Sequence, residues 1–390
     1  METIPFNRPY MTGRELFFIA QAHFSSCIAG DGQFTRQCSE WIERKIGVRR
    51  ALLTHSATTA LELIAMLLDL REGDEIIMPS FTFVTTANAF VREKAVPVFV
   101  DIDTTTLNIS PAAIQSAITP RTRAIVVVHY AGVACDMDAI QEIADAHGIP
   151  VIEDAAHGIL ARHRDRQLGS IGALSCFSFH ETKNITCGEG GALLINDPQY
   201  VERAEILREK GTNRKAFLNG QVDKYTWRDV GSSCLPSELL AAYLWAQLLE
   251  AEDITANRLL AWERYRRLFQ PLEEAGLVQC PAVPGYADHN GHLFYLILDP
   301  RISRNRLFQD LRRVGINAIS HYEPLHLSDA GARLARSGGN LPVTESIAGR
   351  LIRLPLYHGI TEEQQRRVFT VMNLLLRNQA VAPETGTGGN

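Results

Sequence analysis

The residues best suited to chemistry lie between Cys176 and Ala192, where a lysine separates two apolar, strand-like runs. The runs cover Leu174 to Phe179 and Ala192 to Ile195, and Lys183 and three glycines lie between them. Glycines let a backbone approach a ligand closely. A lysine inside a pocket loses solvation of its ammonium form, so its pKa falls and it can act as a Schiff-base nucleophile. An ordinary surface loop is the alternative, and this segment alone leaves both interpretations open.

Length and composition are typical of a globular enzyme. The 390 residues suffice for two or three domains, with 46% hydrophobic and 21% charged residues. A net charge of −5 offers no basic surface to phosphates, so we expect no nucleic acid partner. No apolar run approaches about 20 residues and no signal peptide is recognisable, which predicts a cytoplasmic protein without membrane contact. Seven scattered cysteines without a C-x-x-C pair predict reduced thiols rather than disulfides or a metal site.

Strands and helices alternate along the first part of the chain. Strand patterns at 51–54, 75–78, 96–100, 124–128 and 151–153 alternate with helical patterns at 61–70, 85–92, 111–118 and 138–146. This alternation predicts an α/β fold with a mostly parallel sheet between helices. In such sheets ligands bind beyond the carboxyl ends of the strands. Four candidate groups fall at those ends: Ser56 to Thr58, Phe81 to Phe83, Asp154 with His157, and Ser178 to Lys183.

The rest of the chain predicts a second, smaller domain. We expect a large α/β domain over 12–250, a small α+β domain over 251–380 with an N-terminal arm over 1–11, and a disordered Gly- and Thr-rich tail over 381–390. A long helix from Pro236, with bends, would connect the two domains. Within the small domain we expect a strand near Asn317 to Ile319 and a helix near Thr344 to Ile352.

Six motifs follow one another along the chain. They are Ser56-Ala-Thr-Thr-Ala-Leu61, Pro79-Ser-Phe-Thr-Phe-Val-Thr-Thr-Ala-Asn88, Val151-Ile-Glu-Asp-Ala-Ala-His157, Phe177-Ser-Phe-His-Glu-Thr-Lys-Asn184, Gly188-Glu-Gly-Gly-Ala192 and His321-Tyr-Glu-Pro-Leu-His326. Together they resemble the DegT/DnrJ/EryC1/StrS sugar aminotransferases over nearly the whole length. The resemblance implies pyridoxal 5'-phosphate (PLP) as cofactor and the PLP-dependent transferase fold type I, which is aspartate aminotransferase-like.

Two stretches narrow the resemblance within that family. The form His-Glu-Thr-Lys-Asn at 180–184 and the segment Gly220-Gln-Val-Asp-Lys-Tyr-Thr-Trp-Arg-Asp229 are similar to those of the WecE (RffA) type. The resemblance then implies transfer of the amino group of L-glutamate to C4 of dTDP-4-keto-6-deoxyglucose. The configuration of the new amine, and a cell-surface or an antibiotic pathway, stay open at this point.

The resemblance also implies chemical roles for individual residues. Lys183 would bond to the cofactor as a Schiff base and later move protons, and a lowered pKa suits both tasks. Asp154 would keep the pyridine nitrogen protonated, although capping of the next turn is the simpler interpretation of that residue alone. Phe83, which a core position would also explain, would stack on the ring. His157 would lie near the phenolic oxygen of the cofactor, where most relatives have Gln.

Residues from several segments would bind the cofactor phosphate and the sugar nucleotide. For the phosphate the resemblance implies Ser56, Ala57, Thr58, Ser178 and Ser233, the last standing where relatives often have an asparagine that reaches the phosphate of the partner subunit. That placement implies a homodimer with shared active sites. For the sugar nucleotide, whose phosphates need cationic or N–H partners, the candidates are Lys210, Arg214, His321, Tyr322 and His326. A solvated loop is the alternative for each.

Other PLP-dependent functions remain as alternatives. A C3-aminotransferase or a dehydratase could act on a related nucleotide ketosugar, but relatives that became dehydratases replace the lysine by His, and Lys183 is present here. A non-catalytic, PLP-binding regulator is more remote. Such a regulator needs a nucleic-acid module or a basic patch, and the sequence shows neither.

Overall fold

The computed structural model describes residues 2–218 and 220–381. Its largest sheet contains eight strands: β1 (Arg50–Thr54), β2 (Glu75–Pro79), β3 (Val96–Val100), β4 (Thr122–Val128), β5 (Val151–Asp154), β8 (Leu174–Ser178), β9 (Gly191–Ile195) and β13 (Arg336–Ser337). Their order is β1-β9-β8-β5-β4-β2-β3-β13. In this order, every pair of neighbouring strands from β8 to β13 is parallel. Strand β9 is antiparallel to both of its neighbours, β1 and β8. The predicted α/β fold with a mostly parallel, mixed sheet is confirmed.

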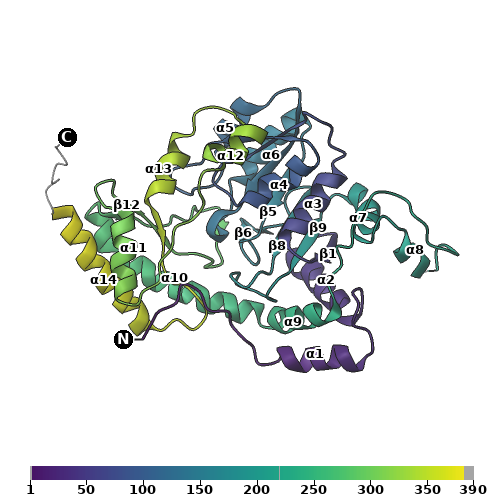
Figure 1. Cartoon of the computed structure of the whole chain (residues 1–390), viewed down its shortest axis with the longest axis horizontal. Helices are drawn as coiled ribbons and strands as arrows, with labels where there is room; N and C mark the ends of the chain where they lie inside the picture. The colour runs from purple at the N-terminus through teal and green to yellow at the C-terminus, as the bar shows by residue number, and fades with distance from the viewer. Residues whose placement is uncertain (1, 219, 382–390) are drawn as a thin grey trace.

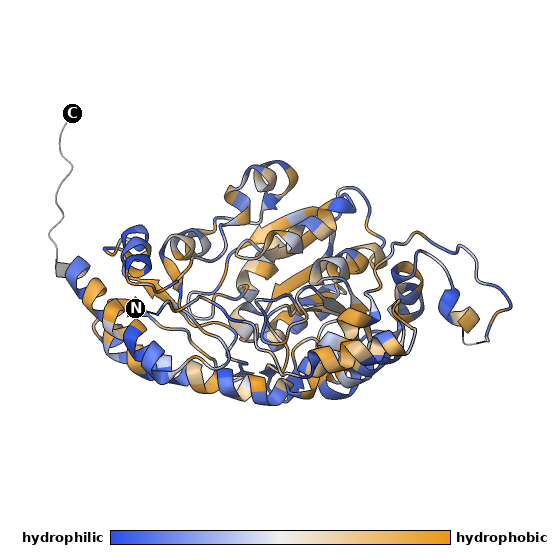
Figure 2. Cartoon of the chain, turned by 60° about the horizontal axis from the view of Figure 1, so that its bottom comes forward, coloured by the Kyte–Doolittle hydropathy of each residue, from blue (hydrophilic) through white to orange (hydrophobic). Residues whose placement is uncertain are grey.

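Helices cover both faces of this sheet. They are α2 (Gln33–Ile46), α3 (Ala57–Leu67), α4 (Val84–Arg92), α5 (Pro111–Ala117), α6 (Met137–His147), α7 (Val201–Arg208) and α9 (Glu238–Leu249). Successive strand residues point to opposite faces, so Ile76 and Met78 join the core with α3 and α4, whereas Ile77 packs with α5 and α6. Figure 2 shows these apolar strands enclosed between the helices.

The C-terminal elements form a smaller layer beside the large sheet (Figure 1). An antiparallel sheet of β10 (Val278–Gln279), β12 (Tyr295–Leu298) and β14 (Leu351–Arg353) packs with α10 (Ala251–Glu274), α11 (Arg304–Arg313) and α14 (Glu362–Val381). The N-terminal residues lie on this layer, where the buried Ile4 donates its N–H to Gly315 O at 2.8 Å. The predicted domain boundary at residue 250 stays a prediction. Two residues from beyond it, Leu325 and Leu341, pack into the core of the large sheet.

Shorter elements complete the fold. They are α1 (Glu15–Phe24), α8 (Arg214–Leu218), α12 (Asp329–Leu334), α13 (Pro342–Arg350), the small sheet of β6 (Arg162–His163), β7 (Arg166–Gln167) and β11 (Ala287–Asp288), and 3-10 turns at Tyr130–Gly132, Pro198–Tyr200 and Leu325–Leu327. In both overall views α8 and its neighbours extend away from the body. Among the described residues, no helix has the length and apolar character to cross a membrane.

The structure corrects two sequence-based element boundaries. The helix expected to reach Ile352 ends at Arg350, because Leu351 adopts an extended backbone and β14 pairs with β12. The strand expected at 317–319 is reduced to one bridge, between Ile319 and Arg353. The bend expected in the long connecting helix is confirmed at Glu250, whose ψ of 12° separates α9 from α10. The predicted tail over 381–390 lies outside the described residues apart from the end of α14.

Candidate active site

A cavity of about 830 Å³ opens at the carboxyl ends of the parallel strands, between the large sheet and the C-terminal layer. Predicted site residues from every expected strand end line it: Ser56, Ala57, Thr58, Phe83, Asp154, His157, Ser178, Lys183, His321 and Tyr322. Phe6 and Asn7 of the N-terminal arm also reach its wall. The structure therefore brings together predicted site residues that are up to 266 positions apart in the sequence, from Ser56 to Tyr322.

Lys183 lies in a tight turn between β8 and β9, where its N–H donates to His180 O at 2.9 Å. Its side chain lines the cavity, so a solvated surface loop no longer describes it. Burial lowers the pKa of Lys183 to about 8, and the charge of Arg353 acts in the same direction, although Asp154 opposes both. The neutral amine, which is the nucleophilic form, is therefore accessible near neutral pH.

Asp154 ends β5 with its carboxylate fixed by neighbours on two elements. Thr86 of α4 donates its hydroxyl to Oδ2 at 2.8 Å, and the backbone N–H of Ala156 donates to Oδ1 at 3.2 Å. Thr86 in turn lies 2.9 Å from the hydroxyl of Thr82. Because these donors fix the orientation of the carboxylate and Asp154 lines the cavity, it can hydrogen-bond to a protonated ring nitrogen of a ligand.

The start of α3 provides an anion-binding position. Ser56 caps the helix by accepting the N–H of Thr59 at 3.1 Å, and the next two amides, of Ala57 and Thr58, belong to the unpaired first turn that lines the cavity. Gly191 of β9 lies against this turn, and a Cβ there would be 2.3 Å from the carbonyl carbon of Ser56. That glycine is needed for close packing of two backbones, and its role is to position the helix start.

His157 presents one of its two ring nitrogens to a cavity residue. Among the described residues its buried Nδ1 has no hydrogen-bond partner, whereas Nε2 lies 3.5 Å from the hydroxyl of Tyr322. Burial, together with the charges of Lys183 and Arg353, holds the pKa of His157 well below its usual range. The ring is thus neutral and has one N–H to donate, and it stacks on His292 with 4.1 Å between ring centroids.

Four predicted binding residues lie outside the cavity of their own chain. Lys210 and Arg214 contact the carboxylate of Glu209 at 3.0 and 3.3 Å, and Ser233 forms a backbone bridge with the same residue. His326 turns to Ser80, with 2.7 Å between Nδ1 and the hydroxyl oxygen. Their predicted contacts with a phosphate or a sugar nucleotide stay predictions.

Arg353 is a cavity residue that the sequence reasoning did not find. Its Nε donates to Ser320 O at 3.1 Å and its guanidinium lies 4.8 Å from the centroid of the Phe6 ring. Within residues 2–218 and 220–381, no carboxylate lies within 4 Å of it, so this largely buried cation remains available to an anion in the cavity. The signal was present, since Arg353 interrupts the apolar run from Leu351 to Leu356.

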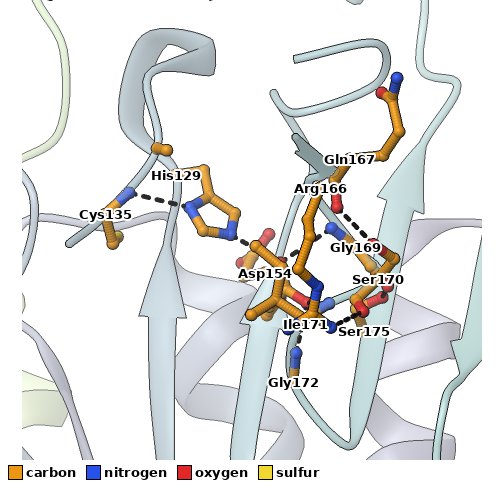
Figure 3. Close-up of polar contacts among 12 residues, drawn as sticks. His129, Cys135, Asp154, Arg166, Gln167, Gly169, Ser170, Ile171, Gly172 and Ser175 are labelled. Atoms are coloured by element: carbon orange, nitrogen blue, oxygen red, sulfur yellow. Dashed lines mark hydrogen bonds and ion pairs between the residues drawn. The ribbon is translucent and has the colours of Figure 1, made fainter. Parts of the chain in front are cut away.

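A buried network behind β5 is structural. Glu153 accepts three backbone N–H groups, from Gly169, Ile171 and Gly172, at 2.7 to 2.8 Å, and lies 2.9 Å from His129 Nε2. Figure 3 shows the His129 ring between this cluster and Cys135, whose N–H donates to Nδ1 at 3.2 Å. Because neighbouring strand residues point to opposite faces, Glu153 fixes the strand while Asp154 faces the cavity.

The residues present fit PLP. The helix start suits its phosphate, Lys183 its aldehyde, Asp154 its ring nitrogen and His157 its phenolic oxygen. Phe83 presents a ring that is 55% exposed at the cavity wall, which leaves an aromatic face free for stacking.

Solved structures that are similar to this chain include aminotransferases. TlmJ from Streptoalloteichus hindustanus has 26% identity and a TM-score of 0.88, with 97% of this chain and 100% of that chain covered. The PLP form of Spr1654 from Streptococcus pneumoniae has 25% identity and a TM-score of 0.88 over the same shares. DesV from S. venezuelae has 29% identity and a TM-score of 0.86, over 98% and 100%. The family model matches residues 13–373, and the chain belongs to the DegT/DnrJ/EryC1/StrS aminotransferase family.

Proposed function

We propose that this PLP-dependent aminotransferase moves the amino group of L-glutamate to C4 of dTDP-4-keto-6-deoxy-D-glucose, giving a dTDP-4-amino-4,6-dideoxyhexose and 2-oxoglutarate. The observation that carries the proposal is a single cavity that contains Lys183, Asp154 and the start of α3. His180 and Thr182, from the stretch that resembles the WecE type, line the same cavity. A volume of about 830 Å³ is in the range of ligand-sized pockets.

The protein would supply orientation and proton transfer. When bound, PLP withdraws electrons from the carbon atom that loses its proton. The Asp154 carboxylate would hold a proton on the pyridine nitrogen, and the Nζ atom of Lys183 would take and return the proton at the reacting carbon. The Ala57 and Thr58 amides would bind the phosphate, and the Nε2–H of His157 would donate to the phenolic oxygen.

Arg353 is the cavity residue that we assign to the carboxylate of the amino donor. It is close enough to Lys183 for its charge to lower the lysine's pKa, and the donor's carboxylate is one carbon away from the amino group that reacts. Planar guanidinium groups bind carboxylates through two parallel hydrogen bonds, which a lysine cannot reproduce. The cavity side of Arg353 would therefore hold L-glutamate in place for the proton transfer.

Replacing Arg353 by Lys should raise KM for L-glutamate roughly 10-fold, because the charge remains and the paired hydrogen bonds are lost. KM for the ketosugar should change little. Steady-state kinetics with each substrate varied in turn measure both values. A rise confined to the ketosugar would instead place its diphosphate on Arg353.

A second copy of this chain would complete the assembly. In helix α1, the side chains of Leu16 and Phe24 are 79% and 82% exposed. Trp227, in the segment that extends from the body, is 82% exposed. Large exposed apolar side chains of this kind mark protein contacts. We propose a homodimer in which the segment around Trp227 reaches the neighbouring active site, and its mass in solution should be twice the 43.3 kDa of the chain.

Turnover of dTDP-4-keto-6-deoxyglucose with L-glutamate and PLP, followed by NMR of the sugar product, tests the reaction. Amination at C4 is the expected result, and the H3–H4 coupling then distinguishes an equatorial from an axial amine. Amination at C3, or consumption of the ketosugar without an aminated product, would reject the proposal in favour of the other PLP-dependent reactions.

A further inference from the structure

Tyr130 is a fully buried phenol whose hydroxyl meets one side chain of the active site. It is 1% exposed and does not line the cavity, and its hydroxyl lies 2.8 Å from Nδ1 of His321. The part of the chain that the structure describes offers this hydroxyl no other hydrogen-bond partner. His321 itself lines the cavity, so Tyr130 is one contact removed from any bound substrate.

The direction of this hydrogen bond follows from the two possible proton positions. If His321 donated from Nδ1, the hydroxyl hydrogen of Tyr130 would be buried without an acceptor, which is costly. If Tyr130 donates, both atoms are satisfied. Burial raises the pKa of Tyr130 well above its usual range, so the phenol keeps the proton that it donates.

The remaining ring nitrogen of His321 then carries the hydrogen. Burial and the charge of Arg353 hold the pKa of His321 well below its usual range, so the ring is neutral and has one N–H. Nε2 of His321 has no hydrogen-bond partner in the described chain. The atom is not fully enclosed by protein, and since His321 lines the cavity, Nε2 is exposed there. Tyr322 stacks on the ring at 3.7 Å between centroids and limits its rotation.

We propose that Tyr130 is a positioning residue that fixes His321 as the Nε2–H tautomer, so that His321 donates a hydrogen bond to an oxygen atom of the carbonyl substrate. The assignment of that oxygen to a ketosugar rests on the proposed function. The tautomer assignment rests only on the buried contact. A carbonyl or hydroxyl oxygen can accept this hydrogen bond. A cationic group, which has only donors, cannot.

A neighbouring histidine provides an internal comparison with the opposite tautomer. His292 lies 2.9 Å from Asn184 Oδ1 through its Nδ1, and the Nδ2 group of Asn184 donates to Asn290 O at 3.0 Å. The amide oxygen of Asn184 must therefore accept, and His292 must carry its hydrogen on Nδ1. His321 and His292, two of the histidines that line the cavity, should thus differ in tautomer within one protein.

Nitrogen NMR of the holoenzyme, labelled with 15N-histidine, tests the tautomers directly. We expect His321 in the Nε2–H form and His292 in the Nδ1–H form, with the His321 signals assigned by their loss in His321→Gln. In Tyr130→Phe the His321 signals should move toward a mixture of tautomers. An Nδ1–H form of His321 in the natural protein, or an unchanged signal in Tyr130→Phe, would overturn the proposal. This result does not depend on which ketosugar is the substrate.

Kinetics test the donor itself. Tyr130→Phe should lower kcat/KM for the carbonyl substrate about 2- to 10-fold, the effect of one neutral hydrogen bond. Tyr295→Phe is the matched control, because Tyr295 is also buried and its ring lies 5.6 Å from that of Tyr130, but it does not contact His321 or the cavity. His321→Gln, whose amide can replace Nε2–H, should retain more activity than His321→Asn, and the reverse order would contradict the proposal.

Discussion

Replacing Lys183 by Ala should reduce amino transfer by about 10⁴-fold or more, since both the bond to the cofactor and the proton transfer are removed. In the described part of the chain, no other lysine lies at the cavity wall to take its place. Turnover of the ketosugar with L-glutamate, measured with purified variant supplied with PLP, checks this expectation. Lys94→Ala, at a side chain that is 74% exposed, is the control and should retain normal activity. Normal turnover in Lys183→Ala would refute the proposed chemistry.

In the cofactor-free protein, Lys183 should lower the free energy of unfolding. Burial lowers the pKa of Lys183 to about 8 from the ordinary lysine value of 10.5, so below pH 8 the folded state carries an ammonium group that it disfavours. Between these two values the unfolded chain binds more protons than the folded chain, and stability rises with pH. Above 10.5 the penalty is gone.

Lys183→Met should therefore stabilise the cofactor-free protein at pH 7 by about 1–2 kcal/mol, less than the full shift because the side chain keeps some exposure to the cavity. The gain should shrink as the pH rises from 8 toward 10.5. Denaturant unfolding of both proteins at several pH values measures it. A difference that grew with pH would contradict the assigned pKa.

Much of the fold could be predicted because its pattern is local. The parallel strands are short apolar runs that end near polar residues, as in Val151–Asp154, and a helical period follows β2, β3 and β4. Since the carboxyl ends of parallel strands share one edge, the sequence alone places Lys183 and Asp154 together. The ends of helices and strands were harder to predict. The end of α13, for example, depends on pairing between β14 and β12 rather than on its own residues.

The residues that sequence reasoning did not find act through contacts between distant segments. Thr86 is an ordinary helical threonine until α4 brings it to Asp154, 68 positions away. Tyr130 meets His321 across 191 positions. Arg353 faces the cavity only because β14 holds its backbone beside Ile319. Such contacts depend on register and packing, which the residue types alone do not encode.

Asp154→Asn should lower kcat by roughly 10²-fold while the protein still binds PLP. The amide keeps the size of the carboxylate but loses the charge that holds a proton on the ring nitrogen, and a hydrogen bond to a charged group contributes about 1.5–3 kcal/mol. Cofactor content after dialysis, measured by absorbance, separates loss of binding from loss of chemistry. Thr86→Val, which removes one donor to Asp154 at 2.8 Å, should have a smaller effect of about 2- to 10-fold. If Asp154→Asn retained most of its activity, the carboxylate would not be the group that protonates the ring, and the Asp154 contacts would serve only to end β5.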